Sequence, residues 1–270
     1  MYYYSGPMYM ATSEGNRVLL LPKNKQVDKG KQASVFFHNY YGDHARWAEM
    51  LRGWRNPFDL YYNIVENSLY NQEISAAGVS RLFREKAGED LQDFHLRFSP
   101  NLGKDIGGKL LLLDSWLKNT GAEGPLLFLH DKRSPQKPDP GTWSRKLLGI
   151  GEPEFVLRAL AMFRANPGIG IITAAGTVMR NGSSNPLLQQ LSERYGLNGR
   201  VTEFVAGTMF WCSARPVRDF FTRYSPLEIR ATMEQGNVMD EEGETVTHSW
   251  ERLLSAVVTA SGGSITELEL

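Results

Sequence analysis

The sequence has only one cysteine, Cys212, so no disulfide can form within the chain. The apolar run around Cys212 favours a buried structural thiol over a reactive one. The sequence also lacks the roughly 18 consecutive apolar residues that a membrane-spanning helix needs. Its first residues lack the charged start and apolar core of a signal peptide. These absences predict a soluble, cytoplasmic protein, and they leave room for peripheral contact with the inner face of a membrane.

An excess of either charge is also missing, since Lys and Arg total 30 and Asp and Glu total 30. This balance argues against a general nucleic-acid binder, but a local basic pocket for phosphates remains compatible with it. Residues 1–32, with four lysines between 23 and 31, are expected to form an N-terminal extension without chemistry. The remaining length suits one large domain at 33–262, followed by a tail at 263–270.

Short apolar runs alternate with helical patterns along the chain. We expect strands at 33–37, 58–65, 93–98, 125–129 and 169–172, and helices at 43–54 (capped by Asp43), 76–87, 107–118 and 154–165. Repeated strand–helix units of this size predict a single-domain α/β fold, with a mostly parallel sheet flanked by helices on both faces. Ligands of such sheets bind beyond the carboxyl ends of the strands. His38 and His130 fall at such ends, and His248 at or near one.

A glycine-rich turn at 99–108 connects an expected strand to a helix. Its glycines permit positive φ and a close approach of the backbone to a ligand, and the helix start offers free N–H groups to an anion. Lys104 could approach a phosphate, and Asp105 could bind a sugar or ribose hydroxyl. The alternative is an ordinary turn with a helix cap, and the spacing matches neither a P-loop nor a dinucleotide fingerprint.

A second turn carries four ionisable residues at the end of the apolar strand 125–129. These residues, 130–133, are costly to bury unless they face a polar ligand or one another. Lys132 and Arg133 suit a diphosphate, whereas His130 or Asp131 could hold a divalent metal or a sugar hydroxyl. The alternative is a solvated surface turn.

An aromatic segment at 204–212 is expected to be a strand with a bulge or close approach at Gly207. Met209 and Trp211 would share one face, and Thr208 and Phe210 the other. Trp211 could form an apolar platform for a sugar ring, or it could simply pack in the core.

A fourth motif at 247–252 begins a helix, with His248 and Arg252 on one face and Glu251 on an adjacent edge. Glu251 could act as a base for an acceptor hydroxyl, and the alternative is a surface helix with a salt-bridged Glu and Arg.

In this order, the motifs resemble the rhamnan synthesis protein F family of polysaccharide-building glycosyltransferases. The resemblance covers about residues 33–258 and is carried by six segments: His38-Asn39-Tyr40-Tyr41, Phe58-Asp59-Leu60-Tyr61, 101–107 with Lys104 where Arg is usual, 129–134, 206–211 unaltered, and His248 to Arg252. It implies a GT-A-like, Rossmann-related fold. It also implies transfer of rhamnose, or another deoxyhexose or hexose, from a dTDP- or GDP-linked donor to a growing bacterial surface polysaccharide or lipopolysaccharide such as O-antigen.

The resemblance also implies roles for particular residues. Glu251 and His248 would be catalytic, and the donor would bind His38, Tyr40, Asn101, Gly103, Lys104, Asp105, His130, Asp131, Lys132, Arg133, Gly207, Thr208, Trp211 and Arg252. The place where related folds keep an Asp-x-Asp metal motif reads His130-Asp131-Lys132. With Asp131 as its single carboxylate, dependence on Mg²⁺ or Mn²⁺ stays open, and Lys132 and Arg133 are expected to replace part of the metal's charge. A catalytically inactive module that binds a carbohydrate or nucleotide sugar is the alternative function.

Overall fold

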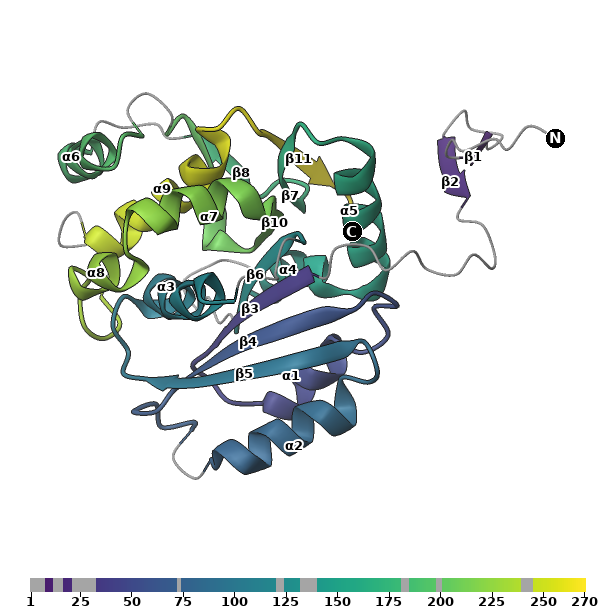
Figure 1. Ribbon diagram of the computed structural model, residues 1–270, viewed down its shortest axis with the longest axis horizontal. Coiled ribbons are helices and arrows are strands. Elements are labelled where there is room, and N and C mark those ends of the chain that lie inside the picture. The colour runs from purple at the N-terminus through teal and green to yellow at the C-terminus, as the bar shows by residue number, and fades with distance from the viewer. Residues whose placement is uncertain are drawn as a thin grey trace. The chain divides into compact units, whose positions relative to one another are not determined.

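The computed structural model describes residues 8–11, 17–20, 33–71, 74–119, 124–131, 140–180, 185–197, 201–238 and 245–270. The chain divides into two units, Met1–Gly30 and Lys31–Leu270. In the first unit, β1 (Met8–Ala11) pairs antiparallel with β2 (Arg17–Leu20). The second unit contains the remaining helices and strands (Figure 1).

Seven strands of the second unit form one sheet in the order β11-β7-β10-β6-β3-β4-β5. Their bounds are β3 (Ala33–Asn39), β4 (Phe58–Val65), β5 (Leu91–Ser99), β6 (Leu126–His130), β7 (Ile169–Ala174), β10 (Phe210–Cys212) and β11 (Ser264–Leu268). Strand β10 runs antiparallel to both of its neighbours, and every other pair is parallel. A smaller antiparallel pair joins β8 (Val178–Arg180) to β9 (Glu203–Val205).

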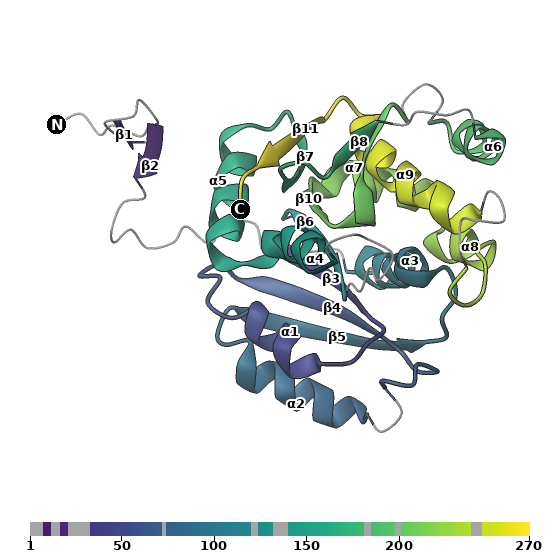
Figure 2. The ribbon, with the colours of Figure 1, turned by 180° about the vertical axis from the view of Figure 1, so that it is seen from behind.

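The sheet has apolar side chains on both faces, and helices cover both (Figures 1 and 2). Along β3, Val35 and Phe37 point to one face and Phe36 to the other, because successive side chains alternate. The first face packs against α1 (His44–Met50), α2 (Ala76–Lys86), α4 (Pro140–Leu148), the 3₁₀ turn η1 (Gly149–Gly151) and α5 (Pro153–Ala165). The second packs against α3 (Lys104–Leu117), α6 (Pro186–Arg194), α7 (Ala214–Arg223), α8 (Pro226–Ala231) and α9 (Val246–Thr259).

The predicted fold class is confirmed: this is an α/β unit of Rossmann-like type whose mostly parallel sheet lies between helices. The expected tail at 263–270 instead supplies β11, an edge strand that pairs in parallel with β7. The single strand expected at 204–212 is interrupted by a 3₁₀ turn, η2 (Ala206–Thr208). Asp43 precedes α1 in a left-handed conformation, and its side chain makes no capping hydrogen bond.

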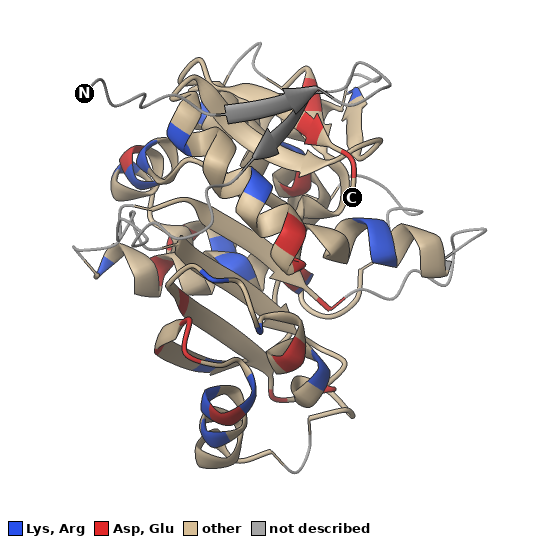
Figure 3. Ribbon diagram, turned by 90° about the vertical axis from the view of Figure 1, so that its right-hand side faces the viewer, with Lys and Arg blue, Asp and Glu red and all other residues tan. Residues whose placement is uncertain are grey.

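Acidic and basic residues are interspersed along the helices and strands in the view of Figure 3. None of the helices in the described part of the chain is long and apolar enough to cross a membrane.

Candidate active site

A row of polar side chains crosses three neighbouring strands near their carboxyl ends. His38 of β3 is in register with Asn63 of β4 and with His130 of β6, and all three are buried. Two residues earlier in each strand, the same row is aromatic and belongs to the core beneath α3: Phe36, Tyr61 and Phe128. The sheet therefore changes from an aromatic layer to a polar one within two residues, at the edge where parallel sheets bind ligands.

His38 lies between this sheet edge and the backbone of α3. Its Nδ1 is 3.1 Å from Nδ2 of Asn63, and a Cβ on Gly108 would lie only 1.8 Å from the same nitrogen. Gly108 therefore lets the imidazole approach the helix. Burial lowers the pKa of His38 to about 4, while Asp105 raises it and Lys109 lowers it by smaller amounts. The ring is thus neutral at neutral pH and presents hydrogen-bonding groups, without a positive charge.

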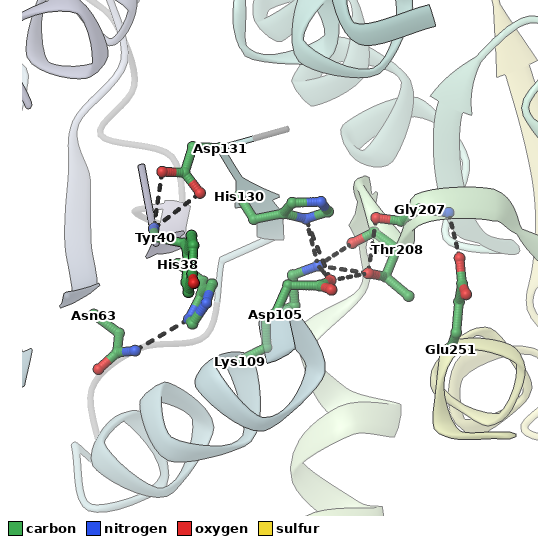
Figure 4. Close-up of polar contacts among 10 residues, drawn as sticks. All are labelled: His38, Tyr40, Asn63, Asp105, Lys109, His130, Asp131, Gly207, Thr208 and Glu251. Atoms are coloured by element: carbon green, nitrogen blue, oxygen red, sulfur yellow. Dashed lines mark hydrogen bonds and ion pairs between the residues drawn. The ribbon is translucent and has the colours of Figure 1, made fainter. Parts of the chain in front are cut away.

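The loop after β3 is held in place at Tyr40. Both carboxylate oxygens of Asp131 accept hydrogen bonds from the Tyr40 amide, at 2.9 and 2.8 Å (Figure 4). Oδ2 also accepts a hydrogen bond from the Tyr41 amide. The Tyr40 carbonyl accepts from Ser68 and Asn71. The ends of β3, β4 and β6 are therefore tied together by side chains that sequence analysis assigned, in part, to the donor.

The glycine-rich turn starts α3 and contacts another part of the chain. Gly103 has a φ of +72° and donates its N–H to the carbonyl of Glu234 at 2.8 Å, and a Cβ there would lie 2.3 Å from Sδ of Met233. Asn101 donates to Asn237, whose amide nitrogen is 3.1 Å from the Tyr40 hydroxyl. These contacts of Asn101 and Gly103 hold segment 233–237 against the turn.

Lys109, one turn into α3 from Asp105, is fully buried. Its Nζ lies 2.8 Å from Oδ2 of Asp105, 2.9 Å from the Thr208 carbonyl oxygen and 3.1 Å from Nδ1 of His130 (Figure 4). Oδ2 of Asp105 is also 3.3 Å from Nδ1 of His130. The Asp105 carboxylate offsets the positive charge of the buried ammonium, so an ion pair lies directly beside the polar row of His38, Asn63 and His130.

The turn η2 has positive φ at two consecutive residues, a conformation that glycine adopts freely and threonine does not. Gly207 has a φ of +75° and Thr208 a φ of +50°, which for a β-branched residue costs on the order of 1–3 kcal/mol. The Thr208 hydroxyl donates to Asp105 at 2.8 Å, and the Gly207 amide donates to Oε1 of Glu251 at 2.7 Å. Two carboxylates from different helices, Asp105 and Glu251, therefore contact neighbouring residues of one turn.

The start of α9 brings His248 to the start of α3. Thr245 caps α9 by accepting from the His248 amide, and its hydroxyl is also 2.5 Å from Nδ1 of His248. The other ring nitrogen, Nε2, is 3.4 Å from Nζ of Lys104. Arg252 donates to the His248 carbonyl at 2.9 Å within α9 and lies over the Phe204 ring of β9.

Glu234 also serves the start of α9, by accepting hydrogen bonds from the Val246 and Thr247 amides and the Thr247 hydroxyl. Burial on its own would raise the pKa of Glu234, but these hydrogen bonds outweigh it and lower the pKa.

The structure brings most of the predicted residues together, but Trp211 is not among them. Trp211 is fully buried, packs against Trp54 and donates to the Ile150 carbonyl, so the predicted sugar platform is wrong and the core alternative is right. Lys132 and Arg133 lie outside the described residues.

The residues that the structure describes do not fit a metal site. Asp131, the predicted ligand, uses both carboxylate oxygens to hold the Tyr40–Tyr41 backbone. Within the described ranges, no three His, Cys, Asp or Glu residues are grouped as metal ligands would be.

Sequence analysis missed Lys109 and Asn63. Lys109 stands in the run Gly107-Gly108-Lys109-Leu110-Leu111, which indicates an apolar helix face, but its position four residues after Asp105 is a signal for pairing. Asn63 is a polar residue inside the buried strand 58–65, and burial of an amide in such a strand is itself a sign of a specific contact.

The sequence matches no protein-family model, and no curated protein shows significant similarity to it.

Proposed function

We propose that this protein is a glycosyltransferase that moves a sugar from a nucleotide-sugar donor to a growing surface glycan. One observation supports the proposal most: residues from separate sequence motifs converge at the carboxyl ends of β3 and β6. Asp105 contacts His130 and Thr208, Lys104 contacts His248, and Gly207 contacts Glu251. The same motifs carry the resemblance to polysaccharide-building glycosyltransferases.

The site offers groups for both partners of such a transfer. Lys104 and the start of α3 would bind the donor phosphates, and Asp105 with His130 would bind hydroxyls of the sugar or ribose. Lys132 and Arg133, which directly follow Asp131 in the chain, would neutralise the diphosphate as it leaves. His38 and Tyr40 would line the donor side of the site.

Glu251 would be the general base. The Gly207 amide holds Oε1, so the carboxylate is oriented before the acceptor arrives. In the proposed step, the acceptor hydroxyl gives its proton to Glu251 and its oxygen bonds to the anomeric carbon. The bond from that carbon to the diphosphate breaks, and the nucleoside diphosphate leaves. His248, fixed by Thr245 and Lys104, would position this end of the site.

The donor and acceptor classes are part of the proposal and depend on the resemblance. The donor would be a dTDP- or GDP-linked rhamnose, or another deoxyhexose or hexose. The acceptor would be a glycan or a lipid-linked glycan of a surface polysaccharide or lipopolysaccharide. A lipid-linked acceptor would require the protein to work beside a membrane surface.

The test is to incubate the full chain with dTDP-rhamnose, GDP-mannose and UDP-glucose, each with Mn²⁺ and with EDTA. Release of nucleoside diphosphate and the melting temperature are measured for each donor. We expect one donor to raise the melting temperature and to be slowly hydrolysed, with turnover persisting in EDTA. Stabilisation by one donor with no consumption, even when glycan acceptors are added, would favour the inactive binding module instead.

The Glu251→Gln variant tests the base. We expect it to lower turnover by at least about 100-fold, a typical contribution of a general base, while the donor still raises the melting temperature. Glu203→Gln is the matched control, because Glu203 is exposed in the β8–β9 pair. Equal turnover in both variants would remove Glu251 from the mechanism.

A further inference from the structure

The ammonium group of Lys109 is completely buried in the middle of the site, so it cannot touch a substrate itself. Its contacts are instead with groups that do line the site. Nζ is within 3.1 Å of Asp105, His130 and both oxygens of Thr208. A role for Lys109 in the proposed reaction must therefore act through these neighbours.

Among these neighbours, Thr208 has the strained backbone conformation. Its φ of +50° is strained, and Lys109 holds both its carbonyl and its hydroxyl, while Asp105 accepts from the same hydroxyl. The preceding residue, Gly207, donates its amide to Glu251. Figure 4 shows the resulting path from Lys109 through the turn to Glu251.

A contribution to folding stability does not by itself explain why the Lys109 ammonium is buried. Buried ion pairs are often no more stabilising than apolar residues of the same volume, because both charges lose their hydration. The same helix carries a second pair with the same spacing, Lys118 and Asp114, whose Nζ–Oδ2 distance of 2.7 Å is nearly equal to that of the buried pair. Lys118 is exposed, so of these two lysines Lys109 alone places its charge against the strained turn at Thr208.

We propose that Lys109 is a positioning residue: its ion pair with Asp105 locks the Gly207–Thr208 turn and thereby fixes the carboxylate of Glu251 for proton transfer. The inference rests on the proposed function where it concerns catalysis. Its structural part, the locking of the turn, can be measured without any substrate.

The experiment compares Lys109→Met with Lys118→Met in the full chain. Hydrogen–deuterium exchange of the peptide 204–212, measured without donor, should be at least tenfold faster in Lys109→Met and unchanged in Lys118→Met. With the donor found above, Lys109→Met should lower kcat at least tenfold, with the donor KM changed less than threefold. A purely structural role would lower the melting temperature without this separation of kcat from KM.

If Lys109→Met alone fails to fold, the double variant K109M/D105N removes both charges and leaves no unpaired carboxylate beside the turn. Its exchange of 204–212 should still be at least tenfold faster than that of Lys118→Met. Equal exchange in the Lys109 and Lys118 variants would overturn the inference, whatever the turnover. If the wild-type chain turns over no nucleotide sugar, the proposed function fails, and the exchange comparison alone decides the role of Lys109.

Discussion

Near the carboxyl edge of the sheet, one residue has a strongly shifted pKa and another has a strained backbone. His38 is a buried imidazole between a strand and a helix, and Thr208 is a β-branched residue with positive φ. Such states cost free energy and persist only where the surroundings determine them. They gather here around groups that the proposed function uses, where perturbed groups are expected in enzymes.

The first prediction concerns His38 and the pH dependence of stability. The pKa of His38 is about 6.5 in the unfolded chain, and burial lowers it to about 4 in the folded chain. Between these values the unfolded state binds more protons, so acid favours unfolding. The stabilisation is complete above about pH 6.5 and is lost as the pH falls through about 4, a change of roughly 3 kcal/mol.

Urea unfolding of the wild-type chain and of His38→Gln, between pH 4 and pH 7.5, measures this contribution. The variant removes the titrating ring, so its unfolding free energy should depend less on pH by about that amount. Parallel pH curves for the two proteins would show that His38 is not buried in its neutral form.

Sequence analysis identified some of the site residues and missed others, because only some of them are marked by a local sequence signal. His130 and Asp105 were found because they follow a strand and start a helix, which are local signals. Lys109 was missed because only the fold brings Thr208 to it from about a hundred residues further along the chain. Trp211 was assigned to a sugar because an aromatic side chain looks the same in a core and in a binding site.

At the scale of elements, strands 33–37 and 58–65 were predicted closely, because buried parallel strands are continuous apolar runs. The segment 204–212 was predicted as one strand because its residues favour β structure throughout. The structure interrupts it at Gly207, where a Cβ would lie 3.0 Å from Cδ1 of Leu147, and the following strand runs antiparallel. Such an interruption depends on tertiary contacts that a local pattern does not contain.

The second prediction concerns the start of α9. Thr245→Ala removes a capping oxygen and should lower the free energy of unfolding by about 1 kcal/mol. Ser75→Ala is the matched control, because Ser75 caps α2 in the same way by accepting from Gly78, away from the site. Thr245 also holds His248, so Thr245→Ala should slow donor turnover as well. Equal turnover in the two variants, at equal loss of stability, would mean that the position of His248 does not affect the reaction.

At the scale of the whole sheet, the site depends on strands that are far apart in sequence. The parallel strands β3, β4 and β6 supply the polar row, and the reversed strand β10 follows directly after the η2 turn that touches it. The alternation of strands and helices predicted this sheet, but its strand order and the reversal of β10 had no local signal. The last strand was missed because Ser264–Leu268 is short, and its two apolar residues, Ile265 and Leu268, are three positions apart and do not show the alternation of a strand.

The third prediction follows from that last strand. Deleting residues 263–270 removes β11, exposes the apolar residues beneath Leu268, and removes the carboxylate of Glu267. That carboxylate accepts hydrogen bonds from three successive amides, those of Gly176, Thr177 and Val178, just after β7. We expect the free energy of unfolding to fall by at least about 3 kcal/mol, from lost apolar burial and lost charge-assisted hydrogen bonds.

Urea unfolding of the shortened chain, beside the full chain and Glu267→Gln, tests this. The substitution keeps the strand and its pairing with β7, so it should cost only about 1 kcal/mol, the share of the charge in those hydrogen bonds. A shortened chain that unfolds at the same urea concentration as the full chain would mean that the sheet is complete without β11. Because β7 lies between β11 and β10, a destabilised edge should also loosen the strand that follows the η2 turn, and donor turnover should fall together with stability.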